Sequence, residues 1–146
     1  TAAAQDDDAE LLALLTEALP VDPPRFTECA FWIAFWGQMS ADKRLKRING
    51  WVHREYLRLF ERCLARGWRE WRQWPPPTRE QALRSVVTFI NGLTASAVAS
   101  PGDWPAARQV GQLRLQLQML HTWAMSAEGA VRVSAARRGR RAVASA

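Results

Sequence analysis

The sequence predicts an all-α fold, a single bundle of five helices. Two observations favour it: apolar residues recur at spacings of three and four along most of the chain, and no segment alternates cleanly enough for a strand. Prolines and glycines separate the periodic segments. The chain has 146 residues, 48% of them hydrophobic, which is enough for one buried core and too apolar for a disordered protein.

The first two predicted helices lie on either side of a proline-rich turn. Residues 1–8 form an acidic leader, and Ala9–Leu19 follows as an amphipathic helix with its leucines on one face. The prolines within residues 20–24 end this helix. Thr27 can then cap a second helix, Glu28–Met39. Because this helix is apolar nearly all round, we expect it to be the central, fully enclosed one.

The third and fourth helices are longer. Ala41 to about Trp71 combines an apolar stripe with a basic, solvated face. Pro75–Pro77 should stop this helix and act as a rigid spacer. Thr78 and Gln81 then have the spacing of a capping box for a helix over Arg79–Ala99.

Apolar stripes define the last two helices. The fourth helix should bury Leu83, Val86, Val87, Ile90, Leu93, Thr94 and Val98. The fifth runs from Pro105 to Trp123 and has a seam with spacings of 3, 4, 3 and 4, formed by Val110, Leu113, Leu117, Leu120 and Ala124. The folded domain is therefore expected to span residues 9–124.

Charge is concentrated at the C-terminal end. The net charge is +6, and the five arginines that follow the last acid, Glu128, account for all but one unit of it. Residues 125–146 are therefore read as a basic, solvated and disordered tail. Contact between its arginines and nucleic-acid phosphates is the alternative.

The chain shows no targeting signal. Its acidic start lacks the basic and apolar regions of a signal peptide, and no window approaches 18 uncharged apolar residues, so we expect a cytoplasmic protein with no membrane partner. Cys29 and Cys63 are expected to be reduced and buried within helices. Since the sequence begins at Thr1 rather than at Met, a fragment or a processed product is expected.

No pattern of catalytic residues is present. His53 and His121 each lack a second histidine or a cysteine at metal-ligand spacing, and no glycine-rich phosphate loop occurs. Neither cysteine has a nearby histidine, and the acids lie on polar helix faces. We therefore expect no enzyme, no cofactor and no metal.

The eight tryptophans are the unusual feature of the composition, and one group lies on the predicted enclosed helix. Trp32 and Trp36 are one turn apart, with Phe35 between them and Met39 close behind, and Trp51 follows on the long helix. Core packing explains such a group. The alternative is a pocket whose aromatic faces bind apolar or cationic small molecules.

A second group, Trp68, Trp71 and Trp74, lies within the sequence WREWRQWPPP. An arginine-stacked helix end is the simplest interpretation of it. A crevice against a partner subunit and a platform for stacking single-stranded bases are the alternatives.

Three motifs carry a resemblance to a known family: Phe31–Trp36 (FWIAFW), Leu45–Asn49 (LKRIN) and Phe89–Leu93 (FINGL). With an aromatic helix running into a basic amphipathic one, the chain resembles the C-terminal ligand-binding and dimerisation domain of TetR-family transcriptional repressors. It looks most like the choline-responsive BetI type. The resemblance extends from about Glu10 to about Leu120, and the WREWRQWPPP junction departs from the family pattern.

This resemblance implies an effector-binding domain that dimerises and allosterically releases DNA. The implied pocket residues are Phe31, Trp32, Phe35, Trp36, Met39, Trp51 and Phe89. The implied contact across a two-fold axis uses Val87, Ile90, Asn91, Leu93, Thr94, Leu113, Leu117 and Leu120. The expected partners are a second copy of the chain and a small apolar or cationic effector. Operator DNA would be bound only through an N-terminal helix-turn-helix domain that is absent from this chain.

Two other classes of function stay open from sequence. A helical protein–protein adaptor predicts no cavity and an exposed apolar groove. An all-α enzyme or carrier needs polar groups that converge on the pocket. A choline-like cation would need an inward acid, for which Glu28 is the nearest candidate.

Overall fold

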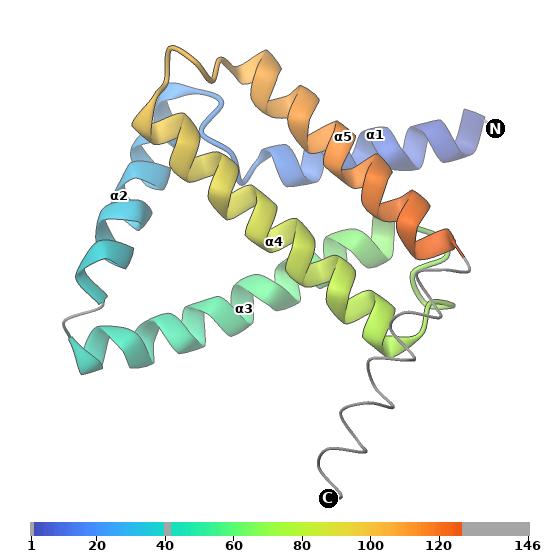
Figure 1. Ribbon diagram of the computed structural model, residues 1–146, viewed down its shortest axis with the longest axis horizontal. Helices are drawn as coiled ribbons and strands as arrows, with labels where there is room; N and C mark the ends of the chain where they lie inside the picture. The colour runs from blue at the N-terminus through green and yellow to red at the C-terminus, as the bar shows by residue number, and fades with distance from the viewer. Residues whose placement is uncertain (1, 40–41, 127–146) are drawn as a thin grey trace, which may run out of the picture.

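Five helices make up the part of the chain that the computed structural model describes, residues 2–39 and 42–126 (Figure 1). This part contains no strand, so the all-α prediction is confirmed. The helices are α1 (Ala2–Thr16), α2 (Pro23–Met39), α3 (Lys43–Gly67), α4 (Pro76–Ala99) and α5 (Ala106–Met125). Apart from Met125 and Ser126, the predicted basic tail lies outside the described residues.

Each of the first two helices begins earlier than predicted. α1 starts at Ala2 and so includes most of the expected acidic leader, because its alanines are the strongest helix formers. α2 starts at Pro23, and the Asp22 carboxylate accepts a hydrogen bond from the Arg25 backbone N–H at 2.9 Å. The prolines fit here because the first helical N–H groups need no partner. Thr27, the predicted cap, instead donates its hydroxyl to the Pro23 carbonyl at 3.1 Å.

The boundaries of α3 and α4 also differ from the prediction. Asp42 caps α3 by accepting the Arg44 backbone N–H at 2.7 Å, and the helix ends at Gly67. α4 begins at Pro76, so the prolines start this helix rather than acting as a spacer before it. No side chain caps α4, and the capping-box prediction was wrong because Thr78 is buried inside the first turn.

The core lies between α1, α3, α4 and α5. α4 contributes most to it, with eight buried residues: Thr78, Ala82, Val86, Val87, Ile90, Leu93, Thr94 and Ala97. Leucines of α1, the C-terminal half of α3 and the turn that follows α3 pack against this face. α4 and α5 are antiparallel neighbours, and α1 packs against α3 and α5 (Figure 1). The predicted apolar stripe of α4 is therefore the central surface of the domain.

α2 is not the enclosed helix that its composition predicted. None of its residues is buried, and it lies at one edge of the molecule, in contact with α3 and α4 (Figure 1). Phe31 is 64% exposed. Apolar character all round predicts burial only where enough other helices surround the segment, and here two neighbours cover one side of it.

Among the described residues, one helix, α4, is long and apolar enough to cross a bilayer by length and composition alone. The expectation that no segment reaches this level was wrong, because it required an unbroken run of apolar residues, whereas the mean hydropathy of α4 is high despite its polar residues. α4 is also the helix with the most buried residues in the described part, and a core helix of a soluble protein passes the same test. The finding is therefore weak evidence for a membrane span.

Gly67 allows α3 to approach α1 closely. A Cβ at this position would lie 2.5 Å from the Leu11 Cβ of α1, a distance that real Cβ atoms do not tolerate. The obstacle is the base of the leucine side chain rather than its flexible end, so the backbones would have to separate.

We predict that Gly67→Ala lowers the free energy of unfolding by about 1–3 kcal/mol through overpacking. Gly50→Ala on the same helix is the matched control, because its Cβ would meet only the Arg54 guanidinium at 3.8 Å. It should raise stability by roughly 0.5–1 kcal/mol. Urea unfolding followed by tryptophan fluorescence measures both, and equal effects of the two substitutions would contradict the close approach.

Candidate functional site

The candidate site is a cavity of about 730 Å³ bounded by α1, α2, α3 and α4. Most of its lining is apolar. Its volume falls within the range of pockets that hold drug-sized molecules, about 300–1,000 Å³. In Figure 1, α2 spans the space between the N-terminal end of α3 and the C-terminal end of α4, and residues of these three helices supply most of the cavity lining.

Three of the seven sequence-predicted ligand residues line this cavity: Trp32, Trp36 and Met39. They follow one another at spacings of four and three, so they share one face of α2. Cys29 and Ile33 complete this face, and the sequence analysis did not assign either to the pocket.

The other four predicted ligand residues do not line the cavity. Phe31 and Phe35 lie on another side of α2 and stack on each other, with ring centroids 6.4 Å apart. Trp51 is 60% exposed on α3, and Phe89 packs against the core from α4. The side chains of neighbouring residues on a helix point about 100° apart. The residues of an uninterrupted aromatic run therefore cannot all face the same cavity.

The wall formed by α3 was predicted only at Trp51, and the α3 residues that line the cavity were missed. Its lining residues are Asn49, Val52, His53, Tyr56, Leu59, Phe60 and Cys63, which recur at helical spacing. The pattern indicated an inward face correctly. It could not show that part of this face meets a cavity rather than packed side chains. His53 lies at the cavity with its side chain exposed.

Tyr56 is the best-buried ionisable group on this wall. Its ring centroid lies 4.4 Å from that of Phe60. Burial raises the pKa of the Tyr56 phenol to about 12, with a smaller contribution from the nearby Cys29 thiol. The phenol is therefore neutral at physiological pH and can donate a hydrogen bond into the cavity.

The two thiols both line the cavity and are free. They are half-buried rather than fully buried. Burial raises the pKa of Cys29, with a further contribution from the Glu28 carboxylate. Burial also raises the pKa of Cys63, against the opposing charges of Arg62 and Arg66. Both thiols therefore stay protonated near neutral pH and act as apolar lining.

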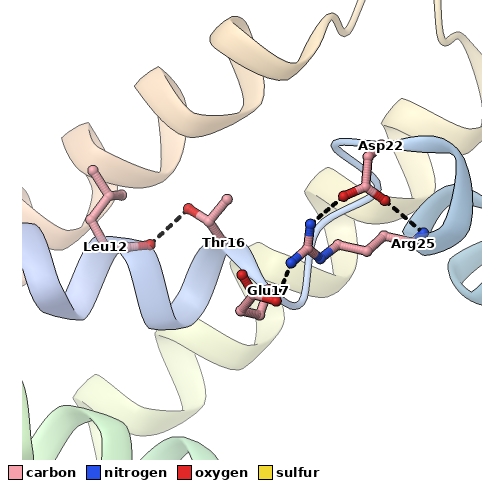
Figure 2. Close-up of polar contacts among 5 residues, drawn as sticks. All are labelled: Leu12, Thr16, Glu17, Asp22 and Arg25. Carbon is pink, nitrogen blue, oxygen red and sulfur yellow. Dashed lines mark hydrogen bonds and ion pairs between the residues drawn. The ribbon is translucent and has the colours of Figure 1, made fainter.

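Charged residues gather where α1 passes into α2 (Figure 2). The Arg25 guanidinium forms ion pairs with the Glu17 and Asp22 carboxylates, which hold the end of α1 against the start of α2. The hydrogen bond to Glu17 is the main cause of the raised pKa of Arg25. Glu17, Arg25 and Glu28 also line the cavity, so this part of its wall carries more carboxylates than cations.

The second tryptophan group belongs to the core and not to a binding surface. Trp68, Trp71 and Trp74 are only 2–6% exposed, with ring centroids 5.3–6.1 Å apart. The His121 ring of α5 packs against Trp68 and Trp74, and its Nε2 lies 3.3 Å from the Glu70 carboxylate. Rings buried to this extent leave no open face on which single-stranded bases could stack. They also exclude a crevice for a partner at this position.

The predicted two-fold contact residues are mostly buried within the chain itself. Val87, Ile90, Leu93, Thr94, Leu113 and Leu117 are all at most 7% exposed, because they form the packing between α4, α5 and the rest of the core. Asn91 and Thr94 line the cavity, and Leu120 packs against the core. These side chains are therefore not available as the surface of a subunit contact in this structure.

Fold and site together describe an all-α domain with a ligand-sized apolar cavity. No group of three or more histidine, cysteine, aspartate or glutamate residues that could hold a metal ion occurs in the described part of the chain. Residues 7–122, most of the chain, match the family described as BetI-type transcriptional repressor, C-terminal. The chain therefore belongs to this family of TetR-type regulators, which are regulatory rather than enzymatic proteins. No curated protein and no solved structure shows a significant match to it.

We predict that the tyrosine ionises with a midpoint near pH 12 in the folded protein and near 10 in the urea-unfolded protein. Tyr56 is the only tyrosine, so absorbance at 295 nm reports on this group alone. The pKa of Tyr56 is higher in the folded protein than in the unfolded one. The contribution of Tyr56 to the free energy of unfolding is therefore complete below pH 10 and is lost as the pH rises through 12. Tyr56→Phe should remove this part of the alkaline loss, and a folded midpoint near 10 would show that the ring is solvated.

Proposed function

We propose that this chain is the effector-binding and dimerisation domain of a TetR-family transcriptional repressor. Its effector is a small apolar or cationic molecule held in the cavity between α1, α2, α3 and α4. The single observation that carries this proposal is a cavity of about 730 Å³ on the aromatic face of α2 in a chain of this family. An adaptor without a small-molecule ligand predicts no such cavity.

The residues around the cavity suit this class of ligand. The indole faces of Trp32 and Trp36 offer broad apolar contact and attract cations through their ring electrons. Glu28 places a carboxylate on the same helix, as a cationic group would require. Tyr56 and Phe60 form an aromatic surface on the α3 wall.

The response to a ligand would be carried by α2. This helix has no buried residue, so it is held less firmly than the helices of the core. A ligand that contacts both α2 and α3 favours the arrangement in which these two walls fit it best. The ligand shifts the equilibrium between this arrangement and the DNA-binding one only to the extent that it binds the first more tightly than the second.

In the parent repressor this shift would change the separation of two DNA-binding domains. Recognition helices in such dimers enter half-sites about 34 Å apart, so a displacement of a few ångströms prevents both from docking at once. Operator DNA would thus be a partner of the parent protein through its N-terminal domain.

The partner in the dimer would be a second copy of the chain, joined through the outward faces of α4 and α5. On α5, Leu115 and Met119 lie one turn apart and are 49% and 59% exposed. On the C-terminal part of α4, small exposed residues recur at spacings of four, three and four: Thr88, Gly92, Ala95 and Ala99. Small exposed residues let helices approach closely, and exposed apolar ones gain from burial. These positions replace the buried ones that the sequence analysis assigned to the contact.

We predict that Trp32→Ala and Trp36→Ala each weaken binding of the apolar dye Nile red by at least about tenfold, since each removes a large apolar surface. The matched control is Trp51→Ala, which removes an exposed tryptophan that does not line the cavity. Dye fluorescence titration measures all three. Equal affinities for the three variants and the wild type would mean that the dye binds elsewhere.

We also predict a solution mass of about 33 kDa by light scattering at micromolar concentration, twice the 16.5 kDa of one chain. The double variant Leu115→Asp/Met119→Asp should reduce the mass to that of one chain, because it places two charges in the contact. Ile48→Asp, at a site that is 53% exposed on α3, should leave the dimer intact. A wild-type monomer would contradict the proposed contact.

A further inference from the structure

The N-terminal half of α3 carries positive charge without acidic partners. Within the described residues, none of its exposed cations forms an ion pair: Lys43, Arg44, Lys46, Arg47 and Arg54. The one acid among residues 42–54 is Asp42, whose carboxylate accepts the Arg44 backbone N–H as the helix cap. In the C-terminal half of the same helix, by contrast, Arg66 pairs with Glu10 of α1. The N-terminal half is therefore a surface of high positive potential.

Three of the arginines form a straight row on one side of the helix. Arg44, Arg47, Trp51 and Arg54 follow one another at spacings of three, four and three, which place all four on one face. At about 1.5 Å per residue, the row is about 15 Å long. None of the four lines the cavity, and Trp51 is 60% exposed. This face is therefore open to a partner.

A row of this kind fits the backbone of duplex DNA. Successive phosphates of one strand lie about 3.4 Å apart along the duplex axis, so a row of about 15 Å faces about four of them. A guanidinium group binds phosphate oxygens through two parallel hydrogen bonds, and an indole N–H donates to another. A transcriptional repressor acts at DNA, and the chain belongs to a family of such repressors.

An anionic lipid surface fits this face less well. Helices that lie in a membrane interface insert a broad apolar face. In the N-terminal half of α3, the exposed large apolar side chains are Ile48 and Trp51 alone. The broad apolar face of this helix is already used, because it lines the cavity and meets the core.

Beyond the proposed effector binding, we propose that the N-terminal half of α3 contacts the phosphate backbone of duplex DNA. In the parent repressor these contacts would add to those of the N-terminal domain. They raise the affinity for DNA without changing which operator is read, because phosphates carry no sequence information directly.

The test is fluorescence anisotropy of two labelled duplexes of unrelated sequence, each of about 20 base pairs, titrated with the full chain at about 50–200 mM salt. We expect the chain to bind both duplexes equally. The triple variant Arg44→Gln/Arg47→Gln/Arg54→Gln should lower the affinity at the lowest salt by at least about tenfold. It should also make the slope of log K against log salt concentration shallower by about 3, one unit for each lost phosphate contact.

The matched control is Arg72→Gln/Arg84→Gln/Arg114→Gln, which removes the same charge at exposed positions on other parts of the fold. We expect it to change the affinity by less than about twofold, because these arginines do not lie in the row. Equal losses in the two triple variants would show that only the overall charge matters and would overturn the proposal.

A third variant tests the basic C-terminal segment of the sequence. Arg137→Gln/Arg138→Gln/Arg140→Gln again removes three charges. A loss of DNA binding in this variant, with the α3 variant binding as the wild type does, would assign the contact to that segment and overturn the proposal. Binding of the wild type to phosphatidylglycerol vesicles but to neither duplex would identify a lipid surface instead, with the same consequence.

Nile red binding separates this proposal from the proposed function. The α3 variant should bind the dye as the wild type does, because none of its three substituted residues lines the cavity. A wild type that binds the dye but neither duplex would contradict the DNA contact and leave effector binding intact. A wild type that binds both duplexes but not the dye would contradict effector binding alone.

Discussion

The packing of Trp68 and Trp74 on His121, with Trp71 against both indoles, is the constraint on which the domain depends. Trp68 follows the last residue of α3, and Trp74 lies two residues before the first residue of α4. Both rings contact His121 near the end of α5. The indole N–H of Trp74 also donates to the Met125 sulfur at 3.4 Å, and Glu70 lies against His121. Three helix ends are thereby held together at one end of the molecule. From this end α3 and α4 diverge, and their far ends are joined only by α2 (Figure 1).

The cavity follows from this arrangement. Two helices that are held at one end and diverge at the other leave a volume between them that their own side chains do not fill. α2 closes the open side, held by partial contacts with α3 and α4 and by the ion pairs of Arg25 at its start. A domain built in this way has a firm core at one end and a weakly held wall at the other. The proposed response to a ligand would need this distribution of stability.

Sequence patterning predicted those features that depend on helical spacing alone. The inward face of α4 was predicted at seven positions. Leu83 and Val98 are half-buried, and the other five are buried: Val86, Val87, Ile90, Leu93 and Thr94. The cavity face of α2 was predicted in part, because Trp32 and Trp36 are one turn apart. Helix starts were predicted poorly at Thr27 and Thr78. Both residues have the chemistry of a cap, but prolines at the first helical positions allowed each helix to begin earlier.

The sequence by itself determined the fold class, the family, the number of helices and the apolar face of most of them, because each depends on local spacing and composition. Tertiary structure decided which apolar faces meet other helices, which meet a cavity and which remain exposed. The two tryptophan groups illustrate the difference. Trp68, Trp71 and Trp74 are buried in the core, whereas Trp32 and Trp36 line the cavity. Burial depends on how many other elements surround a residue, and no spacing within a single helix contains that information.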